Sequence, residues 1–362
     1  MLTIGVEEEY LLLAPVTGVP AARAGKVHAL ADAQAALTEG EVQRELMQAQ
    51  LEVATPVCES LDEVGGHLLR MRHALAEAAE ASGCRLAATG SAPFTDRLTV
   101  PITTKPRYRK LRRSAPGVAD ELLINGMHVH VGVPDREAGV RVLNALRPWL
   151  PVLTGLGANS PMWRGRDSGF ASWRTLVFQG LPVIGLPPEF DGAKDYDQRI
   201  QDLVDTGFIG DRGQLYWHAR LSERFPTVEV RAMDVQLQVD EAVLLTGLIR
   251  ALAARTLDGG EPLRGYPPEY LRAASWHAAR NGASGLLHDP RTGRLAPSRE
   301  VAAGLLAHVD AELRANGERD RLATLLDRLH HHGNGAMRQR RTLRRHGRTA
   351  LVRMIADQTV GT

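Results

Sequence analysis

Acidic side chains stand inside an apolar run at the start of the chain. The segment GVEEEY places Glu7, Glu8 and Glu9 among leucine, isoleucine and valine residues that are typical of a buried strand. Burying an ionised carboxylate without a partner costs several kcal/mol or more, and neighbouring like charges add to that cost. We therefore expect positive charge to meet these carboxylates.

Glu7 and Glu9 are expected on the same face of this strand, because successive strand side chains point to opposite faces. Their separation is then about 7 Å, the two-residue repeat of a strand. A structural salt bridge is the alternative use of such a pair. Glu8 points to the other, apolar face, where an arginine or a backbone donor is expected to satisfy it.

The same alternation recurs in three other predicted strands. HVH puts two histidines on one strand face, TVEVR pairs a glutamate with an arginine, and QLEVAT isolates one glutamate; these residues are His128, His130, Glu229, Arg231 and Glu52. A single histidine on a strand is usually a satisfied core residue. Four strands with polar groups on one face instead predict a sheet that lines a polar funnel.

Carboxylate oxygens are the ligands that Mg²⁺ and Mn²⁺ prefer, and one imidazole is compatible with either ion. Zinc is less favoured, because the sequence has no Cys/His cluster with zinc spacing. Two divalent ions would offset the carboxylates and leave positions open for phosphate oxygens, with Arg231 stabilising charge on a transferring phosphoryl group or an oxyanion. The predicted metal ligands are Glu7, Glu9, Glu52, His128 and Glu229.

Hydrophobic periodicity predicts the elements that position these groups. The predicted strands are 1–14, 45–57, 84–94, 126–134 and two within 213–237 that a turn joins. The predicted helices are 61–83 and 136–159, the second interrupted around Pro148 and Pro151, and helical patterns dominate from about 240 onward. The stretch 161–213 is rich in Gly, Pro, Asp and Arg and predicts long loops.

No linker-like run divides the 362 residues, and apolar residues are spread evenly along them. We therefore predict a single α+β domain over 1–362, with a mostly antiparallel sheet and helices packed on its outer face. Its C-terminal part, about 240–362, is expected to be mainly helical.

The net charge of +2 gives no bulk electrostatic reason to expect a nucleic-acid partner. No apolar run approaches the roughly 20 residues that span a bilayer, and no secretion signal opens the sequence. We expect a cytoplasmic protein that acts on small molecules without a membrane partner; a homo-oligomer is left open. RQRRTLRRHGR, residues 338–348, is either a solvated helix face or a polyanion-binding surface.

At these residues the chain resembles the glutamate–cysteine ligase type 2 family, carboxylate–amine ligases with a glutamine-synthetase-like fold. The resemblance implies a six-stranded antiparallel funnel that nucleotide enters at one end and amino-acid substrates at the other. The matching stretches run from residue 5 to about 340 in the family's order: GVEEEY, QLEVATPVC, GSAPF, PRYRK, NGMHVHVGVPD, NSPMWRGRDSGFASWRT, TVEVRAMD, ARNGASG and GNGAMRQR.

The resemblance also implies residue roles. Glu7, His128 and Glu229 would share one Mg²⁺ ion, and Glu9 and Glu52 would hold another. Some relatives carry an acidic residue where this chain has Gln48. Arg231 and Glu229 would act at the reacting centre. The implied nucleotide-binding residues are His130, Arg231, Arg280 and Arg338, and the implied substrate-binding residues are Arg174 and Tyr108.

The expected reaction joins the side-chain carboxylate of glutamate to the amine of an amino acid. ATP would form an acyl phosphate that the amine attacks, releasing ADP and phosphate. Cysteine is the default acceptor by the family's name alone; another amino acid or amine, as in natural-product biosynthesis, is an alternative. Two other classes remain: a metal-dependent hydrolase that uses His128 and the same carboxylates, and a non-catalytic nucleotide or amino-acid sensor.

Overall fold

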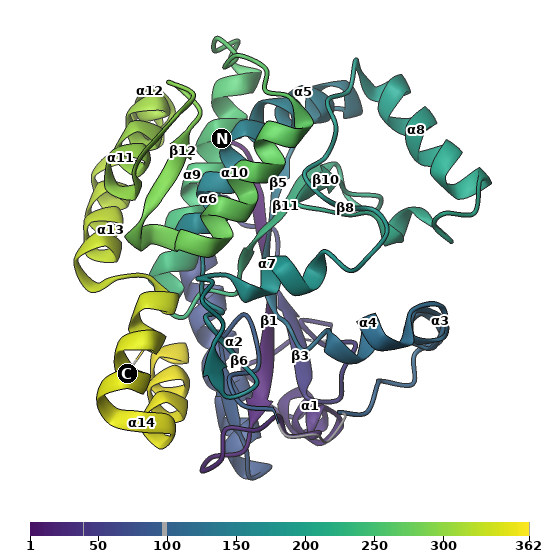
Figure 1. Ribbon diagram of the computed structural model, residues 1–362, viewed down its shortest axis with the longest axis vertical. Helices are drawn as coiled ribbons and strands as arrows, with labels where there is room; N and C mark the ends of the chain where they lie inside the picture. Colours follow the sequence, from purple (N-terminus) through teal and green to yellow (C-terminus); the bar gives the residue numbers. More distant parts are fainter. Residues whose placement is uncertain (39, 96–99, 362) are drawn as a thin grey trace.

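The computed structural model describes residues 1–38, 40–95 and 100–361. Its largest sheet is antiparallel throughout, with strand order β10-β11-β5-β1-β3-β2, while β4 pairs with the far end of β1 (Figure 1). The strands are β1 (Ile4–Leu13), β2 (Val42–Arg44), β3 (Gln50–Ala54), β4 (Arg85–Ala87), β5 (Gly126–Gly132), β10 (Ala219–Leu221) and β11 (Thr227–Asp234). In the described residues this sheet has seven strands where the resemblance implied six; β2, β4 and β10 are only three residues long.

The predicted alternation of β1 is confirmed. From Ile4 to Glu9, buried side chains alternate with half-buried ones, and β1 pairs with β5 along one edge and with β3 along the other. The register places Glu7 opposite His128 and Glu9 opposite Glu52. Pairing between neighbouring strands therefore brings the predicted polar residues onto one face of the sheet.

Helices cover the opposite, apolar face, as predicted for an α+β protein. α2 (Leu61–Ala81), α5 (Arg136–Leu146) and α9 (Val239–Leu257) share one hydrophobic core with the buried residues of β1, β3, β5 and β11. Ser60 and Asp135 begin α2 and α5 by accepting hydrogen bonds from the backbone N–H groups of Glu63 and Ala138.

The other helices surround this unit (Figure 1). They are α1 (Ala24–Asp32), α3 (Pro106–Ser114), α4 (Pro116–Glu121), α6 (Leu150–Leu156), α7 (Trp173–Phe178), α8 (Ala193–Asp205), α10 (Pro268–Asn281), α11 (Ser298–His308), α12 (Asp310–Ala315), α13 (Arg319–His332) and α14 (Gly335–Thr359). Three small two-stranded sheets are β6 (Met162–Trp163) with β7 (Arg166–Asp167), β8 (Ile184–Gly185) with β9 (Tyr216–Trp217), and β12 (Leu286–Asp289) with β13 (Arg294–Pro297). None of the described helices is apolar enough over a sufficient length to cross a bilayer.

Several predicted boundaries were wrong. The predicted loop region 161–213 contains α7 and α8. In α8, apolar residues do recur at helical spacing, at Tyr196, Ile200, Leu203 and Val204, but polar residues surround them and the prediction missed this signal. The predicted strand 45–57 is β3 alone, preceded by a turn, and the predicted strand 84–94 is only three residues long. The mainly helical C-terminal part also includes the β12–β13 hairpin. The single-domain organisation stays a prediction.

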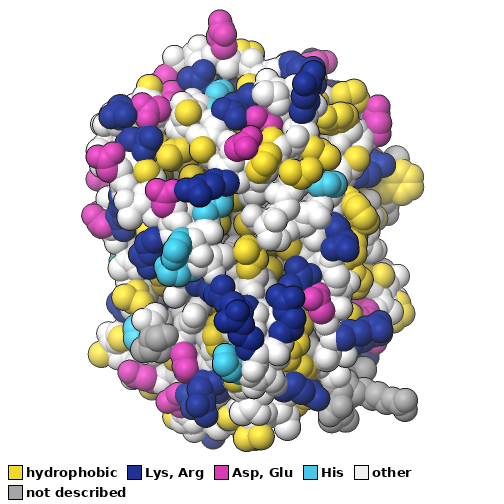
Figure 2. All heavy atoms as spheres, turned by 60° about the vertical axis from the view of Figure 1, so that its left-hand side comes forward, with side chains coloured by type: hydrophobic (Ala, Val, Ile, Leu, Met, Phe, Trp, Pro, Cys, Tyr) yellow, Lys and Arg dark blue, Asp and Glu magenta, His cyan; other side chains and the backbone are white. Residues whose placement is uncertain are grey.

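The basic segment 338–348 lies on α14. Arg338 is buried, Arg340 pairs with Asp167, and Arg344 and Arg345 are exposed. Figure 2, which brings the α11–α14 side forward, shows basic side chains gathered below its centre and mixed with acidic and apolar ones. Most of the segment is thus a solvated helix face with local ion pairs.

Glu8 meets the arginine that its position predicted. The Arg72 guanidinium donates to both carboxylate oxygens of Glu8 (Nε–Oε2 2.9 Å, Nη2–Oε1 2.6 Å), and both side chains are fully buried. Tyr10 donates a further hydrogen bond to Oε2 at 2.5 Å. This buried pair attaches β1 to α2.

We expect Glu8→Gln to lower the free energy of unfolding by about 3–5 kcal/mol, because it leaves Arg72 as a buried charge without its counterion. Urea unfolding of both proteins measures the difference. Glu77→Gln, the same change at an exposed position of α2, is the control and should alter stability by less than about 0.5 kcal/mol. A similarly small effect for Glu8→Gln would contradict a structural role for the pair.

Candidate active site

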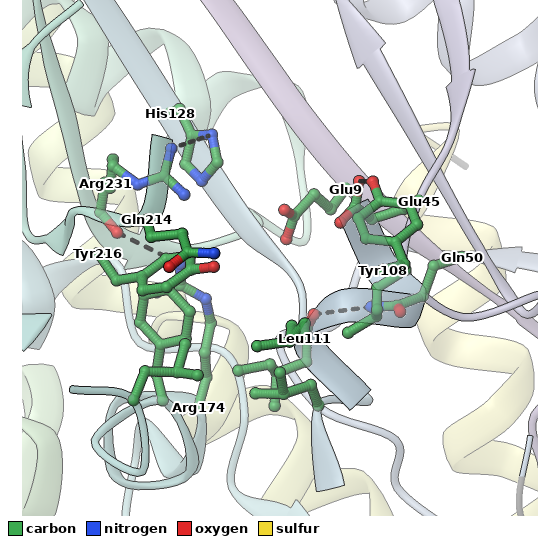
Figure 3. Close-up of a pocket in the computed structure, with 15 residues that line it drawn as sticks. Glu9, Glu45, Gln50, Tyr108, Leu111, His128, Arg174, Gln214, Tyr216 and Arg231 are labelled. Atoms are coloured by element: carbon green, nitrogen blue, oxygen red, sulfur yellow. Dashed lines mark hydrogen bonds between the residues drawn. The ribbon is translucent and has the colours of Figure 1, made fainter. Parts of the chain in front are cut away.

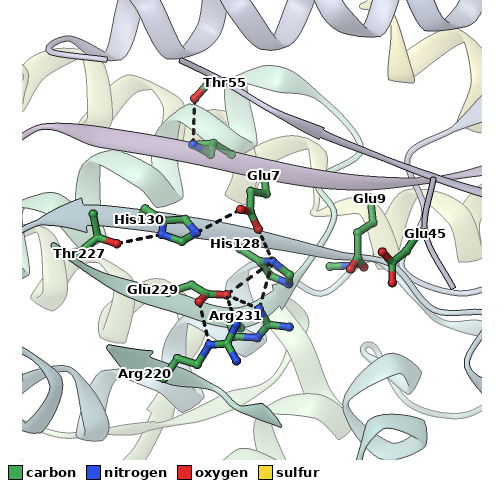
Figure 4. A network of polar contacts seen from close by, with 12 residues as sticks. Glu7, Glu9, Glu45, Thr55, His128, His130, Arg220, Thr227, Glu229 and Arg231 are labelled. Atoms are coloured by element: carbon green, nitrogen blue, oxygen red, sulfur yellow. Dashed lines mark hydrogen bonds and ion pairs between the residues drawn. The ribbon is translucent and has the colours of Figure 1, made fainter. Parts of the chain in front are cut away.

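Two carboxylates and one imidazole meet on the polar face of the sheet, from β1, β5 and β11. His128 Nδ1 lies 3.0 Å from Glu7 Oε2 and 3.9 Å from Glu229 Oε1 (Figure 4). One ligand atom from each of these three residues lies within 4.8 Å of the others. His130 extends the cluster, with Nε2 at 3.4 Å from Glu7 Oε1 and Nδ1 at 3.0 Å from the Thr227 hydroxyl.

The protonation of this group suits a metal ion. Burial raises the pKa of Glu7, but hydrogen bonds from His128 and His130 outweigh burial and hold that pKa far below its usual range. Burial, and then the charge of Arg231, lower the pKa of His128 to about 4. The imidazole is therefore neutral at pH 7, and its buried Nε2 has no hydrogen-bond partner among the described residues. A neutral imidazole whose Nδ1 lies beside two ionised carboxylates suits a cation site.

A second group of carboxylates lies beside the first. Glu9 and Glu52 are paired in register on β1 and β3. Glu45 lies beside Glu9 (Figure 4), and its carboxylate interacts with both. Desolvation, and then repulsion from Glu45, raise the pKa of Glu9 to about 7 and that of Glu52 well above its usual value. The Gly126 N–H donates to Glu9 Oε2 at 2.5 Å. The charges of Arg174 and Arg231 oppose this desolvation and repulsion without overcoming them, so a further cation would favour the ionised carboxylates.

Glu45 was missed in the sequence. The resemblance directed attention to Gln48, whereas Gln48 donates to the carbonyl of Ile102 and the acidic side chain comes from Glu45. Glu45 lies in the turn between β2 and β3, so the alternation of strand side chains cannot predict which way its carboxylate points. A usable signal is that a glutamate precedes the buried pair Leu46 and Met47 at the start of that turn.

Arginines border both groups. Arg231 pairs with Glu229, and its Nη1 lies 3.4 Å from His128 Nδ1; its buried Nε has no hydrogen-bond partner within residues 1–38, 40–95 and 100–361. Arg220, also missed in the sequence, donates to Glu229 Oε2 at 2.8 Å and to the Leu215 carbonyl at 2.9 Å. Burial raises the pKa of Glu229, but Arg231 and then Arg220 overcome that effect and hold it well below its usual range.

Arg174 is a buried guanidinium at the start of α7. Its Nη2 donates to the Arg231 carbonyl at 3.3 Å, and no ion pair joins it to a carboxylate in the part of the chain that the structure describes. Burial, rather than a neighbouring acid, governs its pKa, which is lowered. Arg174 is thus prepared to receive an anion.

A cavity connects these groups (Figure 3). Its polar lining residues are Glu9, Glu45, Gln50, Tyr108, His128, Arg174, Gln214, Tyr216 and Arg231. Tyr108 lies beside Glu9 and Glu45, across the cavity from Arg174 and Arg231 (Figure 3), and its hydroxyl donates to Glu45 Oε2 at 2.8 Å. Of the predicted site residues, Glu9, His128, Arg231, Arg174 and Tyr108 line this cavity. Glu7, Glu52, Glu229 and His130 belong to the two acidic groups described above and are not among its lining residues.

Two predicted residues lie apart from both the cavity and the two acidic groups. Arg280 is exposed, donates to the Gly169 carbonyl and lies over the ring of Phe170. Arg338 is buried in contacts with Gln238 and Glu241. Neither lines the recess, and their nucleotide-binding roles stay predictions.

Residues 3–357 match the family described as glutamate-cysteine ligase family 2 (GCS2). The "Putative glutamate--cysteine ligase 2-1" of Saccharopolyspora erythraea is 43% identical over 346 residues, which cover 95% of this chain and 91% of that protein. The "Putative glutamate--cysteine ligase 2" of Salinispora arenicola is 43% identical over 351 residues, with the same two coverages. The chain belongs to glutamate–cysteine ligase family 2. It is a carboxylate–amine ligase of that type.

Solved structures agree with this family in fold. The crystal structure of glutamate–cysteine ligase from Francisella tularensis in complex with AMP superposes with a TM-score of 0.72 at 13% identity, covering all of this chain and 89% of that one. A bifunctional glutathione synthetase from Pasteurella multocida gives 0.70 at 13% identity, over 99% of this chain and 52% of that one. At such identities the likeness concerns the fold alone, and it confirms the predicted antiparallel α+β architecture of the ligase.

Proposed function

We propose that this ligase uses ATP to phosphorylate the side-chain carboxylate of glutamate and passes the acyl group to the amine of an amino acid. ADP and phosphate are the other products, and cysteine is the acceptor that the family name suggests. The observation that carries the proposal is the pair of acidic groups around Glu7 and Glu9 on one sheet face, bordered by Arg231 and Arg174. A site built to neutralise phosphate and hold carboxylates needs these two kinds of group.

Mg²⁺ or Mn²⁺ fits the residues present. The first group offers two carboxylates and the neutral His128 imidazole, and the second offers three carboxylates whose mutual repulsion favours a cation. When bound, the ions would neutralise phosphate oxygens and polarise the phosphoryl group. The residues that would hold them are Glu7, His128 and Glu229 for one ion, and Glu9, Glu45 and Glu52 for the other.

The chain's own side chains provide charge and position. Glu229 orients Arg231 and outweighs the effect of burial, so the Arg231 pKa stays above its usual range and the group stays charged. Arg231 would stabilise charge on the transferred phosphoryl group and on the tetrahedral centre. Arg174 would bind a substrate carboxylate through its guanidinium fork, and His130 would lie near the nucleotide phosphates.

The direct test incubates purified protein with ATP, Mg²⁺, glutamate and a panel of amino acids. ADP release and mass spectrometry of the amide product are measured together. We expect ADP to form in step with a γ-glutamyl amide, and only when both amino acids are present. Turnover without ATP would favour the hydrolase, and ATP binding without turnover under any amine would favour the sensor.

Gly126→Ala tests the role of Arg174. A Cβ atom at Gly126 would lie 2.3 Å from Arg174 Nη2, so the guanidinium must move while the backbone stays in place. We expect KM for the substrate whose carboxylate Arg174 holds to rise about tenfold, as for a lost charged hydrogen bond of roughly 1.5 kcal/mol, with little change in Tm. Gly132→Ala is the matched control: it lies on the same strand, but its Cβ meets the Thr3 side chain. Unchanged KM values in Gly126→Ala would exclude this role for Arg174.

Metal binding should depend on pH through Glu9. Its pKa of about 7 in the folded protein exceeds the ordinary 4.5, so without metal the ionisation of Glu9 destabilises the fold as pH rises through 7. A divalent ion favours the ionised carboxylate and offsets this loss. The increase in Tm caused by Mg²⁺ or Mn²⁺ should therefore be larger at pH 8 than at pH 6. Glu9→Gln should remove most of this difference, whereas an equal increase in the wild-type protein at both pH values would be evidence against metal binding at Glu9.

A further inference from the structure

The active-site cavity has an apolar side that the proposed reaction has not used. Two of its apolar residues, Leu111 of α3 and Phe178 of α7, are only half-buried, so a ligand can cover them further. The others are buried behind the cavity surface. The full apolar lining comes from four separate segments of the chain and consists of Leu46, Leu111, Leu122, Ile124, Phe178 and Leu181.

We propose that the acceptor amine of this ligase is an α-amino acid with a bulky apolar side chain, of the leucine or phenylalanine class, and that cysteine is a poor acceptor. The inference rests on the proposed ligase function and names the substrate class of the same site. It follows from which surfaces lie next to each other in the cavity.

The carboxylate anchor lies directly beside the apolar surface. The Arg174 guanidinium carbon is 5.4 Å from the centre of the Phe178 ring, and the Phe178 ring meets Tyr216 edge-on with centroids 5.6 Å apart. An amino acid whose carboxylate binds Arg174 therefore brings its side chain against Phe178. Glu9, a proposed metal ligand, projects into the same cavity, so an amino acid bound there would lie beside the proposed metal site (Figure 3).

Glutamate does not explain this surface. Its two carboxylates and its ammonium group need ionic or hydrogen-bonding partners, and contact with leucine and phenylalanine side chains would leave them unsatisfied. The apolar side therefore suits the second substrate.

A cysteine side chain also fits the apolar side of the cavity poorly. One methylene and one thiol would cover little of the apolar surface that Leu111 and Phe178 expose to the cavity, and the uncovered part would stay in contact with water. In a hydrophobic pocket each additional methylene typically raises kcat/KM by about tenfold or more. We therefore expect acceptor efficiency to rise with apolar side-chain size.

The experiment measures kcat/KM for ATP- and glutamate-dependent amide formation with a graded series of amines. The series is serine, cysteine, 2-aminobutyrate, norvaline, leucine and phenylalanine. We expect 2-aminobutyrate, which replaces the thiol by a methyl group, to match cysteine within about threefold, and leucine or phenylalanine to exceed cysteine by tenfold or more. Cysteine at the head of the series would overturn the proposal.

Substitutions in the apolar lining provide a second readout. Leu111→Ser should lower the ratio of leucine to cysteine kcat/KM by about tenfold. Leu295→Ser, the same change at an exposed position outside the cavity lining, should leave the ratio unchanged. Leu111→Phe narrows the cavity without adding a polar group and should lower the ratio of phenylalanine to 2-aminobutyrate. If neither Leu111 variant changes these ratios, the apolar lining does not bind the side chain of the acceptor.

Hydroxylamine tests the ligase function separately from the acceptor class. It attacks the acyl carbon of an acyl phosphate, and phosphate leaves as the hydroxamate forms, without any need for the acceptor pocket. Hydroxamate formation from ATP and glutamate, combined with a preference for cysteine, would reject the acceptor class and keep the ligase function. Absence of hydroxamate and of every amide would reject both.

Discussion

Glu7→Gln is expected to lower the rate of ADP release by about 10³-fold or more, while the protein stays folded. Glu7 contacts His128 and His130, and no arginine pairs with it in the described part of the chain. Its side chain is 28% exposed, so a neutral replacement leaves no uncompensated buried guanidinium behind. The substitution removes a proposed metal ligand at little structural cost.

Glu229 is a less clean test of the same proposal. It is buried and pairs with both Arg220 and Arg231, so its removal would also leave two guanidinium groups without their counterion. Glu77→Gln, on the exposed side of α2, provides the charge-matched control for Glu7→Gln. Circular dichroism and Tm establish folding, and a coupled ADP assay measures the rate. Wild-type turnover in Glu7→Gln would remove Glu7 from the proposed metal site.

Arg231→Ala is expected to lower kcat by about 10³-fold with little change in the affinity for ATP. The guanidinium would act on charge that develops during transfer, so its loss should affect the transition state more than the bound nucleotide. Glu229 keeps Arg220 as a partner in this variant, which limits the damage to the fold.

Single-turnover kinetics and a direct ATP-binding measurement separate the two effects of Arg231→Ala. Arg224→Ala, at an exposed position in the β10–β11 turn, is the control for loss of an arginine. If kcat stays within about threefold of wild type, Arg231 does not act on the transition state. If ATP affinity falls in proportion to kcat, Arg231 acts in nucleotide binding instead.

Local pattern alone predicted the acidic face of the sheet. Side chains alternate along a strand for steric reasons that involve only near neighbours, so Glu7 and Glu9 could be placed together, and Glu8 opposite them, without knowing the fold. The same rule placed His128 with His130 and Glu229 with Arg231. The desolvation cost of Glu8 also predicted its partner type, which Arg72 fulfils.

Pairing between strands was beyond such local reasoning. Glu7 lies opposite His128, more than a hundred positions away, because β1 and β5 adopt one register among several that their patterns allow. Glu45 reaches Glu9 only because a turn folds the chain back ahead of β3, and Arg220 reaches Glu229 only because β10 pairs with β11.

The amino-acid sequence by itself thus determined which residue types face the funnel and the family to which the chain belongs. The tertiary structure decided which carboxylates share a site, that Arg280 and Arg338 lie outside the cavity, and that Leu111, Ile124 and Phe178 form one apolar wall. The physical reason is that alternation and periodicity are local properties of the backbone. A cavity wall is assembled from segments far apart in the chain, and their relative positions depend on the packing of the whole core.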